Sequence, residues 1–230
     1  MLGDTVLTFR RRKAFALLVY LVMSKGTRSR EALASLLVDE ASDQQAHSRF
    51  RNTLHAPTEQ VGDYILVTRE TVTFDRSKPY WLDADELQRG VLTADDPAAD
   101  PTALERAVAL YKGTFLTGLM LSEAPEFEGW QRRQQERLHR LFMQALHLLI
   151  QRALQRRDDE AAQSWIARLL EVEPWHEEAH RQLMRLLARQ GQRQAALEQY
   201  EVCCCILEEE LGRAPQSETV ALYEALRAAP

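Results

Sequence analysis

Hydrophobic residues recur with helical spacing in two short stretches near the start of the chain. Residues 11–24 are apolar on nearly every side, a pattern that predicts a buried helix. Residues 29–38 carry leucines on one face behind Ser29, and this predicts a second helix with a serine cap. Residues 5–9 form a short strand candidate ahead of both.

A third helix and a hairpin are predicted next. Ser42 opens a capping box, and apolar residues then recur every fourth position on one helical face. Strand-like runs at residues 64–67 and 71–74 flank a polar turn and predict a β-hairpin. Three helices followed by a hairpin is the order of a winged helix-turn-helix, whose third helix enters the major groove of DNA.

Pro57 falls inside this third helix, which the pattern places over residues 44–61. Proline has no N–H to donate, and its ring clashes with the preceding turn, at a cost of roughly 3 kcal/mol in a helix interior. It also disfavours the helical conformation at the residue before it. We therefore predict that the regular helix ends or bends between Leu54 and Thr58.

The hydrophobic pattern predicts helices throughout the second half of the chain. Prolines and aspartates mark a loop at residues 93–101, and a helix is expected to start near Thr102. Ala162 and Ala196 lie 34 residues apart, and a bulky residue follows each by four positions, which is typical of tetratricopeptide (TPR) repeats. Such repeats bury their faces only against stacked neighbours, so a continuous array is expected.

The predicted fold is therefore mostly α, an N-terminal winged helix-turn-helix with a small β-hairpin followed by an all-helical TPR-like array. We place the winged-helix domain at residues 1–80, a linker or docking segment at 81–101, and the array at 102–230.

Charge and composition narrow the classes of function. The net charge is −5, but residues 1–75 carry ten Lys and Arg against nine Asp and Glu, so only this part suits a phosphate backbone. No apolar run reaches the roughly 18–20 residues that span a bilayer. Three adjacent cysteines have no metal-ligand spacing and fit a reducing cytoplasm. No nucleophile–base set or phosphate-binding loop is present, so no enzyme activity, cofactor or metal is predicted.

Polar residues opposite the apolar face of the third helix are the candidate DNA-reading set. Arginine pairs with guanine and asparagine with adenine through two hydrogen bonds each. A cation at the hairpin tip suits a phosphate or the minor groove. The same residues also fit an ordinary solvated helix face and a polar turn, and the pattern alone leaves both interpretations open. The candidates are Ser48, Arg51, Asn52, His55 and Arg69.

Several motifs resemble one bacterial family. Those in the second half are similar to the bacterial transcriptional activation domain, at residues 126–130 (EFEGW), 174–184 (PWHEEAHRQLM), 196–200 (ALEQY) and 210–215 (ELGRAP). Residues 12–21 and 29–37 resemble the OmpR-type winged helix of the same antibiotic regulatory protein (SARP) family. The resemblance covers nearly the whole chain in the family's domain order. It implies binding to double-stranded DNA, often as a pair on repeated sites, with recruitment of RNA polymerase.

Two functions follow. The first is a DNA-binding transcription regulator that contacts the transcription machinery or partner domains through its helical array. The second is a protein-interaction module, such as the regulatory N-terminus of a larger signalling ATPase, whose winged helix no longer reads DNA. Pro57, a short N-terminus and the near-neutral first domain favour the second function. The polar helix face, the hairpin and the domain order favour the first.

Overall fold

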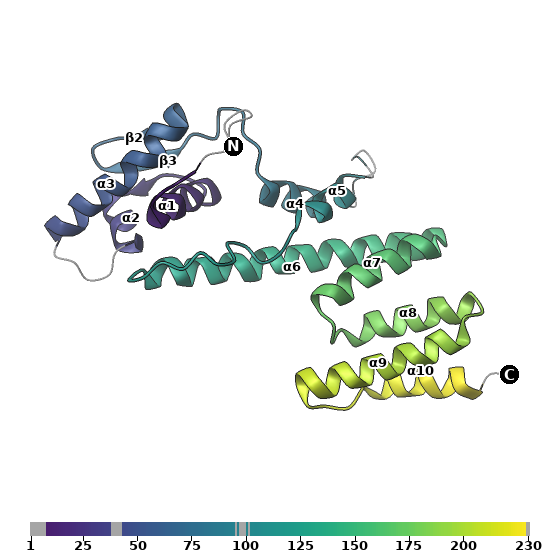
Figure 1. Cartoon of the computed structure of the whole chain (residues 1–230). Helices are drawn as coiled ribbons and strands as arrows, with labels where there is room; N and C mark the ends of the chain where they lie inside the picture. Colours follow the sequence, from purple (N-terminus) through teal and green to yellow (C-terminus); the bar gives the residue numbers. More distant parts are fainter. Residues whose placement is uncertain (1–7, 38–42, 95, 97–99, 101, 229–230) are drawn as a thin grey trace. The chain divides into compact units, whose positions relative to one another are not determined.

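The computed structural model describes residues 8–37, 43–94, 96, 100 and 102–228 (Figure 1). The chain divides into two compact units, the first formed by Met1–Leu82 with Gly113–His139 and the second by Asp83–Lys112 with Arg140–Pro230. Helices dominate both units, and the described strands form a small antiparallel sheet in the first unit. The mostly α fold class is confirmed, with a winged helix followed by a helical array.

Three helices form the centre of the first unit. They are α1 (Arg12–Met23), α2 (Arg30–Leu37) and α3 (Asp43–Val61), and their apolar faces share one buried core. The Ser29 hydroxyl accepts a 3.1 Å hydrogen bond from the backbone N–H of Ala32, so the predicted serine cap of the second helix is confirmed.

Helix α3 continues through Pro57 to Val61, so the helix does not end between Leu54 and Thr58, and that part of the prediction is wrong. A bend of the helix at the proline stays a prediction. Pro57 is itself buried, and it extends the buried face of Phe50, Leu54 and Val61 at spacings of four, three and four residues. The ring therefore packs on the apolar side of the helix, and its burial offsets part of the lost hydrogen bond. Local propensity alone gave the wrong helix boundary.

The sheet has the order β1-β3-β2. The hairpin of β2 (Ile65–Val67) and β3 (Thr71–Phe74) is confirmed, with Leu66 paired to Thr73. Strand β1 (Arg28–Ser29) pairs with the other edge of β3 and was not predicted, because two residues carry no alternating pattern. The candidate strand at residues 5–9 falls mostly outside the described residues, and Thr8 and Phe9 are not in a strand. A one-turn 3-10 helix, η1 (Gly62–Tyr64), links α3 to β2.

Residues 113–139 complete the core of the first unit, whereas the sequence predicted an array over residues 102–230. Leu121, Phe127 and Trp130 are buried among the helices of the winged helix. The Trp130 ring lies 4.9 Å from the ring of Tyr20 in an edge-to-face arrangement. The EFEGW motif at the start of α6 (Pro125–Arg156) therefore covers the winged-helix core.

The second unit is a layered helical array. It contains α4 (Asp83–Leu92) and α5 (Ala103–Leu110), followed by the later part of α6. Helix α4 was not predicted, and it packs on α5 where Gly90 permits a close approach. A Cβ atom at Gly90 would lie 3.1 Å from the Cβ of Ala107.

The remaining helices follow the predicted 34-residue repeat. These are α7 (Asp159–Val172), α8 (Glu177–Arg189), α9 (Arg193–Leu211) and α10 (Ser217–Ala228). Helices α7 and α9 start 34 residues apart, and Ala162 and Ala196 are both fully buried. Helices α8, α9 and α10 lie side by side, in green to yellow in Figure 1.

Candidate nucleic-acid interface

Helix α3 has one buried face and one exposed polar face. Phe50 and Leu54 are buried in the core of the first unit. Successive helical residues point about 100° apart, so the positions between these two face away from the core. All four helical candidates from the sequence are exposed on this side: Ser48, Arg51, Asn52 and His55. The structure thus brings the four side chains to one accessible surface.

His55 has a partner on its own helix. Its Nδ1 lies 3.6 Å from a carboxylate oxygen of Glu59, one turn further along, and the two side chains are 76% and 73% exposed. Water screens a contact in so open a position, so the contact adds little to stability. Glu59 nevertheless places a negative charge at the C-terminal end of the polar face.

The hairpin tip has a defined turn that presents Arg69 to solvent. The Thr68 hydroxyl oxygen accepts hydrogen bonds from the backbone N–H groups of Glu70, at 3.2 Å, and Thr71, at 2.9 Å. The Thr68 N–H donates to the Thr71 carbonyl at 2.9 Å. Arg69 is exposed between these fixed positions. A threonine turn of this kind narrows the range of positions that the arginine head can reach.

The residue that joins the hairpin to the helices was not predicted from the sequence. Arg30, the first residue of α2, contacts the turn through both its backbone and its side chain. Its role follows from the pairing of β1 with β3, which two strand residues are too few to reveal. Strand β2 also packs against α3, so the hairpin and the candidate helix belong to one structural body.

The described residues contain no metal site, and the buried cysteine among them is not activated. No group of three or more His, Cys, Asp and Glu side chains is arranged to hold a metal ion in the described part of the chain. Cys203 is buried, and burial raises the pKa of its thiol to about 12, which disfavours the reactive thiolate. Within the same residues, no helix is long and apolar enough to cross a membrane.

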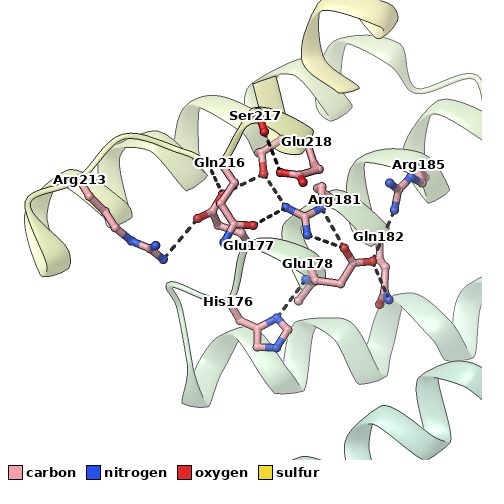
Figure 2. A network of polar contacts seen from close by, with 12 residues as sticks. His176, Glu177, Glu178, Arg181, Gln182, Arg185, Arg213, Gln216, Ser217 and Glu218 are labelled. Carbon is pink, nitrogen blue, oxygen red and sulfur yellow. Dashed lines mark hydrogen bonds and ion pairs between the residues drawn. The ribbon is translucent and has the colours of Figure 1, made fainter. Parts of the chain in front are cut away.

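Two family-like motifs meet in the second unit (Figure 2). Glu177, in the PWHEEAHRQLM segment, is 5% exposed, and one carboxylate oxygen accepts the N–H of Gln216 at 2.7 Å and the hydroxyl of Thr219 at 2.9 Å. Its other carboxylate oxygen lies 3.3 Å from the guanidinium of Arg213, in the part of the ELGRAP segment that follows the end of α9. Arg181 donates to the Thr219 hydroxyl at 2.8 Å. Together these contacts hold the start of α10 against α8.

Two histidines of the same segment are neutral structural groups. His176 Nδ1 accepts the N–H of Ala179 at 3.2 Å and so caps α8. His180 is buried between the carbonyl of Pro174, 2.7 Å from Nε2, and the side chain of Gln199, 2.6 Å from Nδ1. Burial lowers the pKa of both imidazoles.

Comparison with known families agrees with this architecture. Residues 82–227 match the family described as bacterial transcriptional activator domain. The chain belongs to this family. It is a family of transcription regulators rather than of enzymes, and the resemblance of the second half to the bacterial transcriptional activation domain is confirmed. Among curated proteins, none matches the chain in sequence.

One solved structure has a similar fold over nearly the whole chain. It is Mycobacterium tuberculosis EmbR in complex with a low affinity phosphopeptide, with a TM-score of 0.62 and 16% sequence identity. The match covers 97% of this chain and 61% of the EmbR chain. At this identity the likeness establishes the fold, a winged helix joined to a helical array.

Proposed function

We propose that this member of the family binds double-stranded DNA through α3 and the hairpin. The observation that carries the proposal is the division of α3 into a buried face and an exposed face that holds Ser48, Arg51, Asn52 and His55. A helix that anchors one side in the core and presents polar side chains on the other has the arrangement that major-groove reading requires.

Each exposed side chain has a distinct role in this proposal. Arg51 suits the O6 and N7 acceptors of guanine, and Asn52 suits the N6 and N7 groups of adenine. Ser48 and His55, roughly one turn to either side, would bind neighbouring base edges or sugar-phosphate oxygens. His55 must exchange its contact with Glu59 for one with DNA, which costs little because that pair is exposed.

Arg69 contributes without reading the sequence. Its place at the hairpin tip suits a backbone phosphate or the adjacent minor groove. A phosphate contact raises the affinity for every sequence alike and makes binding more dependent on salt. The near-neutral charge of residues 1–75 implies few such contacts and a shallow dependence on salt.

We assign contact with RNA polymerase or partner domains to the helical array of the second unit, formed by Asp83–Lys112 and Arg140–Pro230. Pairing of two copies on repeated sites belongs to the same proposal. A cytoplasmic location follows from it, because DNA and RNA polymerase are there in bacteria. These proposals on partners and location are supported by the chain's membership of a family of transcription regulators.

The structure adds one observation in favour of the second function, an interaction module without DNA reading. Glu59 is exposed on the candidate helix and would repel a phosphate backbone. The near-neutral charge of residues 1–75 favours it as well, whereas the continuity of α3 through Pro57 weakens the argument from the proline. DNA reading is therefore the better supported of the two functions.

Selection from random DNA fragments with the full chain tests the proposal. Enrichment of a common site is expected, and Arg51→Ala and Asn52→Ala should each relax preference at particular positions by about 1–3 kcal/mol. Arg69→Ala should weaken binding to all sequences equally. Arg132→Ala removes an exposed arginine on α6 and is the charge-matched control. A selected site whose affinity does not respond to either helix variant would favour the interaction module.

A further inference from the structure

Arg30 links three parts of the winged helix through separate contacts. Its backbone N–H donates to the carbonyl of Glu70 at 2.8 Å, directly after the two residues of β1 that pair with β3. Its side-chain Nη1 donates to the carbonyl of Thr68 at 3.3 Å. Its guanidinium carbon lies 5.7 Å from the ring centre of Phe50, the buried anchor of α3.

The two carbonyls that Arg30 binds lie on either side of Arg69. Thr68 precedes this residue and Glu70 follows it, so one residue holds both ends of the exposed tip. The Thr68 hydroxyl closes the turn from within by accepting the N–H groups of Glu70 and Thr71. The position of the tip relative to the sheet is therefore fixed by Arg30 from outside the hairpin.

The third contact relates the tip to the candidate reading helix. A guanidinium within about 6 Å of an aromatic ring gains a cation–π attraction. Phe50 is followed immediately by Arg51 and Asn52 on the exposed side of α3. One planar group thus touches the hairpin turn and the residue next to the candidate base readers.

We infer that Arg30 is a positioning residue that sets the hairpin tip, and with it Arg69, at a fixed place relative to α3. Its side chain acts on DNA through Arg69, and its consequence for DNA binding rests on the proposed function. The inference concerns Arg30 itself and is measurable in the free protein.

The shape of the guanidinium matters to this role. Arginine presents a rigid planar fork that can lie near an aromatic ring and donate a hydrogen bond in its own plane. A lysine ammonium carries the same charge as a compact point group without that plane. Arg30→Lys therefore keeps the charge and loses the joint contact, whereas Arg30→Ala loses both. Each variant keeps the backbone bond to Glu70, so the fold is expected to survive.

Amide hydrogen exchange of the full chain without DNA is the first test. The amides of Glu70 and Thr71 should exchange about three- to tenfold faster in Arg30→Ala, the factor that one ordinary hydrogen bond corresponds to. Arg30→Lys should behave similarly. Arg28→Ala is the matched control, because the Arg28 side chain contacts Lys25 and Tyr20 instead of the turn. Unchanged tip exchange in Arg30→Ala, or full protection in Arg30→Lys, would overturn the inference.

A double-mutant cycle on a selected DNA site is the second test. Arg30→Ala should make the salt dependence shallower by about one phosphate contact, as Arg69→Ala does. Combining the two changes should add nothing beyond Arg69→Ala alone. Additive losses would mean that Arg30 contacts phosphate itself, and the positioning role would be wrong. If the unaltered chain binds no DNA, the proposed function fails and the exchange test alone decides the role of Arg30.

Discussion

The hydroxyl of Thr219 donates a 2.9 Å hydrogen bond to the carboxylate of Glu177, across 42 residues of sequence. Both side chains are buried, and Arg181 donates to the same hydroxyl. Each partner is expensive to leave unpaired, because a buried charge or polar group has lost its water. Together with the contact between Glu177 and Arg213, this hydrogen bond ties the PWHEEAHRQLM segment to the ELGRAP segment and to the start of α10.

Thr219→Val should therefore destabilise the second unit. Valine keeps the volume and removes the hydroxyl, so Glu177 and Arg181 each lose a hydrogen bond. A loss of about 1–3 kcal/mol in unfolding free energy is expected from urea titration. Val220→Thr, the reverse change at the exposed neighbouring position, is the control and should have little effect. Equal effects at the two positions would argue against the network as a stabilising element.

Ala162 tests the register of the helical repeat. It is fully buried in α7, among the apolar side chains of the second unit's core. Ala162→Leu should lower stability by about 1–3 kcal/mol through overpacking. Gln163→Leu makes the same kind of change one position along, at a partly exposed site, and should do little. Thermal unfolding of the two variants compares them directly, and similar melting temperatures would show that the repeat register is wrong.

The sequence predicted those parts of the fold that repeat or alternate. The 34-residue spacing, the hairpin and the polar face of α3 all extend over enough residues to carry a pattern. Strand β1 and the hydrogen bonds of Arg30 to the hairpin turn were not predicted. Their partners lie some 40 residues away in the sequence, and a strand of two residues shows no alternating pattern. Pro57 was misjudged for a related reason, since its burial against the core is a tertiary effect that local propensity does not contain.

The histidine that caps α8 should make the second unit sensitive to acid. Burial lowers the pKa of His176 below its ordinary value of about 6.5, so the folded state binds a proton less readily than the unfolded chain. Its contribution to stability is complete above about pH 6.5 and is lost as the pH falls through the lowered folded value. Protonation also removes the Nδ1 acceptor that caps Ala179.

His176→Asn separates these effects, because asparagine is a good helix cap that does not titrate. The variant should be about as stable as the parent at pH 7.5 and should lose less stability between pH 7 and pH 5. Urea unfolding at several pH values measures the difference. His55→Asn replaces an exposed histidine in the other unit and should leave the acid-induced decline of the second unit in place. A parallel decline in His176→Asn and the parent would place the acid sensitivity elsewhere, with buried His180 the next group to examine.

Pro57→Ala compares the free energy gained by an uninterrupted helix with the free energy lost when the buried ring is removed from the core. Alanine restores the N–H that can donate to the carbonyl of Thr53 and removes the ring clash, a gain of roughly 3 kcal/mol. Against this stand the buried ring atoms, worth about 0.8 kcal/mol for each methylene, and the stiffer unfolded chain that proline provides, worth about 0.4–1 kcal/mol. The net expectation is a small stabilisation, up to about 1 kcal/mol.

DNA binding by the same variant shows whether reading depends on the local geometry that proline imposes. The candidate readers Arg51, Asn52 and His55 all precede Pro57 in α3, and their side chains face away from the buried ring. If binding merely tolerates proline, affinity for a selected site should stay level or improve. Should the stabilised variant instead lose specific binding while keeping its weak affinity for random DNA, proline sets the angle of the reading helix. A clear loss of stability in Pro57→Ala would mean that burial of the ring outweighs the restored hydrogen bond, and that this position serves the core first.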